Sequence, residues 1–343
     1  MPKYGHIILE LSMATTLHDV CRETGFSTAT VSRVLNNSPL VTPETRERVL
    51  KAMEKLDYHP SLAARALSIQ RTETIGIHLP DIGPGFYTKI LQGAESVAFD
   101  KHYHLMTAIS HGVRDAQQQI IRLIRERRVD TLIVVNLDLP GPFLAEVNCH
   151  GLPIISMDTP AVEHGIPSVS IDNHKGGYDL MQHMLGHGYR DILIFAGPKI
   201  SYDSRGRLEG CRASARDAGI AIPADNIVTG DFRIESGAAL MDNILKSGRK
   251  RPEAIVSLND AMAIGALGVM RGRGLKTPDD LAIAGFDDSD AASIIGLTTV
   301  GIPHYQMGQE AARLALSSLE EASHPPQHII VSTQLTVRHS CGC

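Results

Sequence analysis

The stretch TLHDVCRETGFSTATVSRVLN, residues Thr16 to Asn36, predicts two short helices joined by a tight turn. Thr16 can cap the first helix, and Gly25 can end it because glycine tolerates the left-handed backbone found after a helix. Ser27 can cap the second helix. The apolar positions that recur at helical spacing are Leu17, Val20, Val31, Val34 and Leu35. The pattern is typical of a helix-turn-helix.

The outward face of the second helix is small and polar, and carries Thr28, Ala29, Ser32, Arg33 and Asn36. Hydroxyls and amides bind phosphates, an arginine fork pairs with guanine and a methyl group contacts thymine, so this face fits a DNA major groove. The alternative is a surface helical hairpin with an ordinary polar face. Base edges are expected to be read by Thr28, Ala29 and Arg33. Phosphate contacts are expected from Thr16, Ser27, Ser32 and Asn36.

A third helix is expected directly afterwards. Thr42 can cap it, Pro43 suits its first position and Glu44 complements its positive N-terminal end. Its core-facing residues are expected to be Val49, Leu50, Met53 and Leu56. The run that follows is rich in alanine, which favours a helix, but it is too short to be a stable helix alone.

Together these runs resemble the DNA-binding headpiece and hinge of the lac-repressor/galactose-repressor (LacI/GalR) family of bacterial transcription regulators. The resemblance rests on TVSRVLN at Thr30–Asn36, VTPETRERV at Val41–Val49 and YHPSLAARAL at Tyr58–Leu67. It implies a helix-turn-helix headpiece at 15–59 and a hinge helix at 60–71 that forms on operator DNA. It also implies DNA contacts by Tyr58, Ala64 and Leu67, with Leu67 wedged between central base pairs.

Composition places the chain among globular proteins. Its 343 residues are 43% hydrophobic, enough for a small DNA-binding unit and a two-lobed body. Residues 15–71 carry eight Lys or Arg and six Asp or Glu, a net charge of +2, whereas the whole chain carries −5. The remainder is therefore at −7, which is consistent with a DNA-reading head on an acidic body. No apolar run approaches the roughly 20 residues of a membrane span.

The five cysteines include no CxxC motif, and this usage is typical of a protein in the reducing cytoplasm. Cys21 is expected to be a small core residue of the first helix. Residues 1–14 are expected to be a disordered leader, or to lie upstream of a true start at Met13.

From Thr74 onward, apolar runs alternate with helical patterns, which predicts two doubly wound parallel sheets. The expected strands are 75–79, 103–109, 131–136, 153–157, 168–171, 191–196, 227–230, 254–257 and 281–285. The expected helices are 86–102, 116–127, 175–187, 205–218, 235–245 and 261–271. Two such lobes side by side make a hinged clamp that can close around a ligand.

The resemblance to the family continues through MQHMLGHGYRDILIFAGP at Met181–Pro198, SRGRLEGCRASARDAGI at Ser204–Ile220 and GLKTPDDLAIAGFDDSD at Gly274–Asp290. It implies a periplasmic-binding-protein-like body at 74–343. Lobe one would span about 74–171 and 304–331, and lobe two about 172–302 together with the C-terminal tail. A small-molecule effector would bind between the lobes, and a homodimer would bind a pseudo-palindromic operator in double-stranded DNA.

Four polar residues lie at or just after expected strand ends: Asp158, Arg207, Asn259 and Asp287. Carboxylates, a guanidinium and an amide suit bidentate hydrogen bonds to a polyhydroxylated ligand, so a sugar or sugar derivative is the expected effector. The alternative is that Asn259 and Asp287 cap helices. The resemblance implies effector contacts at Arg207 and Asp287. An apolar wall is expected from Phe86, Tyr87, His304 and Tyr305.

No motif marks catalysis or a cofactor. Gly83–Gly85 does not match a phosphate-binding loop, and His183 and His187 lack the glutamate of HExxH. Cys341 and Cys343 form only a short terminal Cys-Gly-Cys, so we expect no metal. An extracytoplasmic sugar-binding protein would need a signal peptide, and a sugar-modifying enzyme would need an acid/base pair. The sequence favours an effector-controlled transcription regulator, most simply a repressor, with a phosphocarrier protein as an alternative co-effector.

Overall fold

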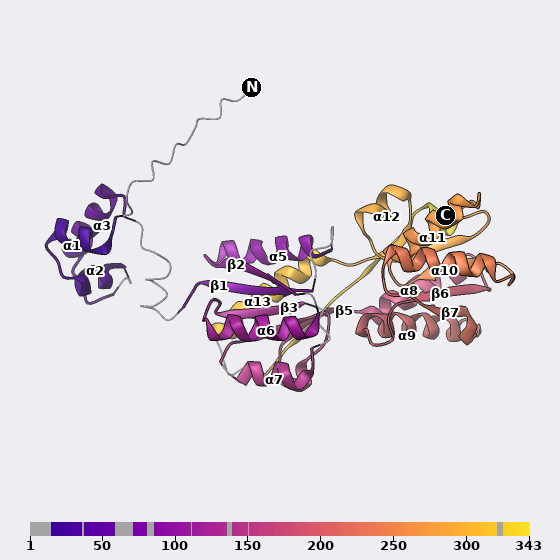
Figure 1. The fold of residues 1–343 in the computed structure, drawn as a ribbon, viewed down its shortest axis with the longest axis horizontal. Helices are drawn as coiled ribbons and strands as arrows, with labels where there is room; N and C mark the ends of the chain where they lie inside the picture. Colours follow the sequence, from indigo (N-terminus) through magenta and orange to yellow (C-terminus); the bar gives the residue numbers. More distant parts are fainter. Residues whose placement is uncertain are drawn as a thin grey trace, which may run out of the picture. The chain divides into compact units, whose positions relative to one another are not determined.

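Figure 1 shows the computed structural model of the chain, which describes residues 15–35, 38–58, 71–80, 86–110, 112–135, 139–149, 151–320 and 325–343. The predicted leader, Asn36 and the hinge residues Ala64 and Leu67 lie outside the described residues, as does the side chain of Phe86. The chain divides into two compact units, 1–72 and 73–343, called here the headpiece and the body. In the described part of the chain, no helix is both long and apolar enough to cross a bilayer.

The headpiece contains α1 (Leu17–Thr24), α2 (Thr28–Leu35) and α3 (Pro43–Lys55). The predicted helix ends are confirmed: Gly25 has a φ of +73°, and the Ser27 and Thr42 hydroxyls accept hydrogen bonds from backbone amides three residues on. The buried core consists of Val20, Val31, Val34, Val49, Ala52 and Tyr58. The prediction for Leu50 is wrong: its side chain is 51% exposed, because the buried face of α3 runs through Val49 and Ala52 instead.

Lobe one of the body is built on a six-stranded, fully parallel sheet in the order β11-β5-β4-β3-β1-β2. Its strands are β1 (Thr74–Leu79), β2 (His104–Ile109), β3 (Thr131–Val135), β4 (Ile154–Met157), β5 (Ser168–Ile171) and β11 (His328–Val331). Its helices are α5 (Phe86–Asp100), α6 (Val113–Arg125), α7 (Gly141–Cys149) and α13 (His304–Glu320). Strands β1 and β3 are buried along their whole length, as expected for a sheet covered on both faces.

Lobe two has a second six-stranded sheet, in the order β12-β10-β9-β8-β6-β7. Its strands are β6 (Ile192–Ala196), β7 (Ile227–Thr229), β8 (Ala254–Ser257), β9 (Ala282–Asp287), β10 (Thr298–Gly301) and β12 (Gln334–Thr336). Its helices are α8 (Asn173–Gly186), α9 (Tyr202–Asp217), α10 (Ile234–Lys246), α11 (Asp260–Gly272) and α12 (Asp290–Ile295). The chain passes between the lobes after β5, after β10 and after β11, and three segments run between the two lobes in Figure 1.

The predicted fold class is confirmed, with one exception in lobe two. Strand β12 pairs antiparallel with β10, because the chain returns to lobe two from lobe one by a short crossing instead of through a helix. Three helices (α7, α12 and α13) and the last three strands were not predicted from the sequence.

Helices α8 and α9 pack unusually closely. A Cβ at Gly177 would collide with the backbone carbonyl of Arg207, and one at Gly210 would collide with the carbonyl of His174. Only glycine permits this approach. It matters for function because α8 begins at Asn173 and α9 carries Arg207, so the two glycines bring these side chains together.

Candidate functional site

The outward face of α2 is accessible. Ser27, Thr28, Ala29 and Arg33 are exposed and Ser32 is half-buried, so these predicted DNA contacts lie on or directly before α2 and are at least partly accessible. Thr16, at the N-terminus of α1, is also exposed, and its backbone N–H and hydroxyl both donate to the Asp19 carboxylate. Tyr58 differs from the others: it is only 9% exposed and belongs to the headpiece core.

Arg33 is an exposed cation in the last turn of α2. Other cations of the headpiece are engaged: Lys51 pairs with Glu47 at 2.7 Å, Lys55 with Glu23 at 2.6 Å, and Arg48 donates to the Thr24 carbonyl. Among the described residues, Arg33 makes no hydrogen bond or ion pair. An exposed guanidinium at the surface of a recognition helix can donate two hydrogen bonds to one guanine.

In the body, Arg207 lies in a largely buried polar group that we call the interlobe cluster. Its members are Asp158, Asn173, Arg207 and His304, which are buried, and Asp203 and Asp287, which are half-buried. The Arg207 guanidinium donates to Asn173 Oδ1 at 2.9 Å and to the Leu258 carbonyl at 2.7 Å, and pairs with Asp287 Oδ1 at 3.2 Å. It also lies 3.9 Å from the centroid of the Phe286 ring. Arg207 is 5% exposed, so this buried charge depends on its hydrogen bonds and its ring contact.

The carboxylates of the cluster come from both lobes. Asp158 follows β4 of lobe one, whereas Asp287 ends β9 of lobe two. Burial raises the pKa of Asp158 well above its usual value, and the nearby negative charges of Asp203 and Asp287 raise it further. Burial also raises the pKa of Asp287 to about 7, although the Arg207 guanidinium opposes the rise. Both residues have left-handed backbones, with φ of +72° at Asp158 and +120° at Asp287; strain of this kind concentrates at functional sites.

Asp158 retains an unused hydrogen-bonding atom. Its side chain is 6% exposed, and its Oδ2 has no hydrogen-bond partner in the described part of the chain. A buried carboxyl oxygen without a partner costs free energy, and a ligand hydroxyl would satisfy it.

His304, at the start of α13 in lobe one, lies near enough to Arg207 for the two charges to interact. Burial, together with the charges of Lys89 and Arg207, lowers the pKa of His304 to about 4. The imidazole is therefore neutral near pH 7 and offers a polar edge to the cluster. Tyr87 is half-buried and packs on the body core, while Tyr305 is 45% exposed.

Asn259 caps a helix. Its Oδ1 accepts from the backbone N–H of Met262 at 3.0 Å, and its Nδ2 donates to the Phe232 carbonyl at 2.9 Å. The capping alternative is therefore confirmed for Asn259. For Asp287 it is not, because the Asp287 carboxylate pairs with Arg207 instead.

Sequence reasoning missed Asn173 and Asp203. Asn173 links Arg207 to Asp203. Its Oδ1 accepts a hydrogen bond from Arg207, and its Nδ2 donates to Asp203 Oδ1 at 2.8 Å. Asn173 follows strand β5, the same signal that identified Asp158, and Asp203 lies in the first turn of the helix after β6. A second missed contact joins the lobes: Lys89 on α5 pairs with Asp290 on α12 at 3.2 Å.

Comparisons with known proteins find relatives of both the headpiece and the body. A family model described as bacterial regulatory proteins, lacI family, matches residues 16–61, and one described as a periplasmic binding protein-like domain matches residues 181–341. The chain is 33% identical over 333 residues to the HTH-type transcriptional regulator RegA of Clostridium saccharobutylicum, covering 95% of this chain and 100% of that protein.

Two solved structures share the whole architecture. The lac repressor dimer bound to operator and the anti-inducer ONPF is 26% identical, covers 96% of this chain and 99% of its own, and superposes with a TM-score of 0.84. The complex of the transcriptional regulator CelR with cellobiose is 29% identical in sequence and has a TM-score of 0.72. The match covers 95% of this chain and 99% of the CelR chain. The relatives are regulators of transcription and not enzymes. The chain belongs to the lacI family of bacterial regulatory proteins, DNA-binding transcription regulators with a ligand-binding domain.

Proposed function

We propose that the protein is a cytoplasmic repressor whose affinity for operator DNA is controlled by a polyhydroxylated small molecule, a sugar or sugar derivative, bound at the interlobe cluster. The observation that carries this proposal is that a guanidinium held in place by hydrogen bonds lies near a buried carboxyl with an unsatisfied oxygen. Arg207 is held by three acceptors, and Asp158 Oδ2 has no hydrogen-bond partner among the described residues.

The chemistry of the cluster supports this ligand class. Neighbouring hydroxyls of a sugar can accept from Arg207 and donate to Asp158 and Asp287, an arrangement of donors and acceptors that an apolar ligand could not satisfy. Because Asp158 belongs to lobe one and Arg207 to lobe two, a ligand held by both would favour one relative position of the lobes. The CelR complex with cellobiose is a precedent for a sugar in a similar chain.

On the DNA side, we propose that Thr28, Ala29 and Arg33 read base edges while Thr16, Ser27, Ser32 and Asn36 bind phosphates. Because one headpiece covers only a few base pairs, two are needed for a unique site, and the protein acts as a homodimer on a pseudo-palindromic operator. Ala64 and Leu67 of the hinge are proposed to bind the minor groove, and Tyr58 to support the headpiece from its core.

The test is a thermal-shift screen of the full chain against sugars, sugar acids, nucleosides and purines. A ligand at about 100 times its Kd should stabilise the folded state by about 2.7 kcal/mol. Each ligand found is then titrated against Arg207→Lys and, as a matched control on the same helix, Arg205→Lys. A sugar that binds wild type and the control but not Arg207→Lys supports the proposal. A sugar that binds all three equally, or a screen in which only nucleosides or purines bind, contradicts it.

A further inference from the structure

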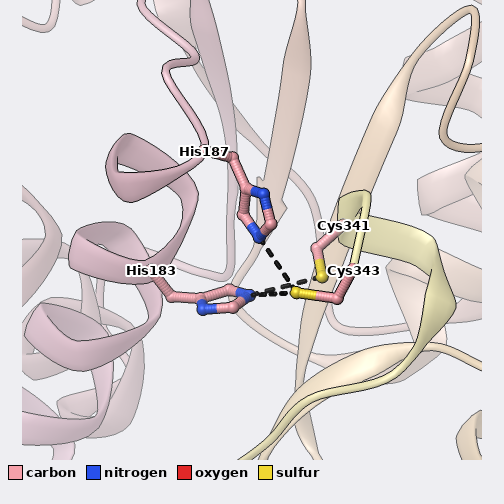
Figure 2. A group of neighbouring side chains, drawn as sticks. All are labelled: His183, His187, Cys341 and Cys343. Carbon is pink, nitrogen blue, oxygen red and sulfur yellow. Dashed lines mark hydrogen bonds between the residues drawn. The ribbon is translucent and has the colours of Figure 1, made fainter.

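A second group of side chains in lobe two lies outside the interlobe cluster. His183 and His187 of α8 face Cys341 and Cys343 of the C-terminal tail, as Figure 2 shows. His183 Nε2 is 3.3 Å from Cys341 Sγ and 4.0 Å from Cys343 Sγ, and His187 Nε2 is 3.2 Å from Cys343 Sγ. The four side-chain atoms all lie within 4.8 Å of one another.

Local geometry explains this convergence. His183 and His187 are four residues apart at the C-terminal end of α8, so both rings project from one face of the helix. The two cysteines flank Gly342, whose φ of +101° is in the left-handed region. That turn brings the two sulfur atoms together. A side chain at Gly342 would also approach the Tyr189 hydroxyl.

The distances fit a tetrahedral metal. Zinc bonds of about 2.3 Å to sulfur and about 2.05 Å to nitrogen place the nitrogen and sulfur corners of a tetrahedron about 3.6 Å apart. The three nitrogen–sulfur distances lie on either side of that value. We propose that His183, His187, Cys341 and Cys343 form a tetrahedral Cys2His2 site for a thiophilic divalent cation, with Zn²⁺ as the expected ion.

The surroundings also suit a cation. The C-terminal end of α8 carries the partial negative charge of the helix dipole, which favours a positive ion. On binding, each cysteine loses its thiol proton to solvent, and the two thiolates balance the charge of the ion. The Thr298 hydroxyl lies 3.1 Å from Cys341 Sγ and 2.9 Å from the Arg338 carbonyl, and its single hydrogen can be donated to the thiolate in place of that carbonyl.

The absence of a recognisable motif has a simple cause. The paired ligands come from segments more than 150 residues apart in sequence, and neither His-x-x-x-His nor Cys-Gly-Cys alone resembles a zinc motif. Our expectation of no metal was based on each segment separately. The fold joins them by returning the tail to lobe two as strand β12.

The proposed metal site, called here the clasp, would fix the C-terminal tail to α8. The tail is held on lobe two by Ser340, whose hydroxyl donates to the Ile283 carbonyl at 2.6 Å, and by Arg338, which pairs with Asp288 at 2.6 Å. A metal would add bonds from the tail to α8. The other end of α8 carries Asn173, so the clasp and the interlobe cluster lie about 20 Å apart along one helix. Zinc is therefore a structural ion here and does not touch the effector.

The test uses the full chain, reduced and freed of metal by a chelator. Zn²⁺ binding is measured by competition with a chromophoric chelator, and Co²⁺ is added as a spectroscopic probe. The expected result is one tight Zn²⁺ per chain, a Co²⁺ complex with strong tetrahedral visible bands and a sulfur-to-cobalt charge-transfer band, and a higher melting temperature with Zn²⁺. Cys343→Ser and His187→Gln should weaken Zn²⁺ binding by about 100-fold or more.

His174→Gln is the matched control, an exposed histidine on the first turn of α8, and it should bind Zn²⁺ as wild type does. Cys343 is also exposed, so Cys343→Ser should fold normally. Three results would overturn the proposal: Zn²⁺ affinity that is the same in wild type and Cys343→Ser, an octahedral Co²⁺ spectrum, or a Cys341–Cys343 disulfide in protein alkylated at cell lysis.

Discussion

Replacing Arg207 with lysine tests how the interlobe cluster is held together. Lysine keeps the positive charge and can still pair with Asp287, but it cannot also donate to Asn173 Oδ1 and the Leu258 carbonyl in the geometry of a guanidinium. Each buried acceptor left without a donor costs about 1–3 kcal/mol. Loss of the contact with the Phe286 ring costs about 0.5–2 kcal/mol more. We expect Arg207→Lys to lower the free energy of unfolding by about 3–5 kcal/mol.

The assay is urea denaturation followed by far-UV circular dichroism, because the chain has no tryptophan to serve as a fluorescence probe. Arg205→Lys is the control: Arg205 is exposed and donates only to the backbone carbonyls of Lys199 and Ile200, so its loss should cost no more than about 1 kcal/mol. Equal losses in the two variants, or a loss below about 1 kcal/mol in Arg207→Lys, would refute the reasoning that Arg207 is the hub of the cluster.

Three further predictions address the headpiece, the lobes and pH. Arg33→Ala should weaken binding to operator by about 1–3 kcal/mol and relax preference at one base pair, measured by fluorescence anisotropy; equal weakening on random DNA would contradict base reading. Lys89→Glu should lower effector affinity several-fold, because two carboxylates would then face each other across the lobes. The double variant Lys89→Glu with Asp290→Lys reverses the charges of the pair and should restore effector affinity, measured by calorimetry. Effector affinity that stays low in the double variant would mean that the pair does not couple the lobes. Burial lowers the pKa of His304 to about 4 from 6.5, so its contribution to stability is present above pH 6.5 and is lost as pH falls toward 4. Between about pH 7 and pH 5, His304→Gln should therefore lose about 1–2 kcal/mol less stability than wild type in urea denaturation, and identical pH profiles would contradict the shift.

Hydrophobic periodicity was sufficient to predict the three headpiece helices, the first five strands of lobe one (β1–β5) and the first four strands of lobe two (β6–β9). Most strands in these segments are short buried runs, as in β1, β3 and β6, so local pattern and tertiary environment agree there; the edge strands β2 and β7 are only partly buried. Apart from α7, the elements that were not predicted lie in the C-terminal quarter of the body. There the chain alternates between lobes, with β10 and β12 in lobe two and α13 and β11 in lobe one, and no local pattern encodes which sheet a strand joins.

The candidate site was predicted in part for a similar reason. Three of the predicted residues lie at or after the ends of strands: Asp158, Arg207 and Asp287. Because the ends of parallel strands meet at one edge of a sheet, the positions of these residues could be inferred. Asn173 also follows a strand, but its contact with Arg207 depends on the close approach of α8 to α9 at Gly177 and Gly210. The Cys2His2 group required the path of the tail, which depends on the antiparallel pairing of β12 with β10.

The central claim is that a ligand between the lobes controls DNA binding, and thermodynamic linkage tests it most directly. An operator is selected from a random DNA pool with the full chain, and its Kd is measured with and without a saturating effector from the screen. The account predicts a change of about 5-fold or more in operator Kd, and the same factor in effector Kd when operator is added. An operator Kd that is the same with and without a bound effector would contradict the account.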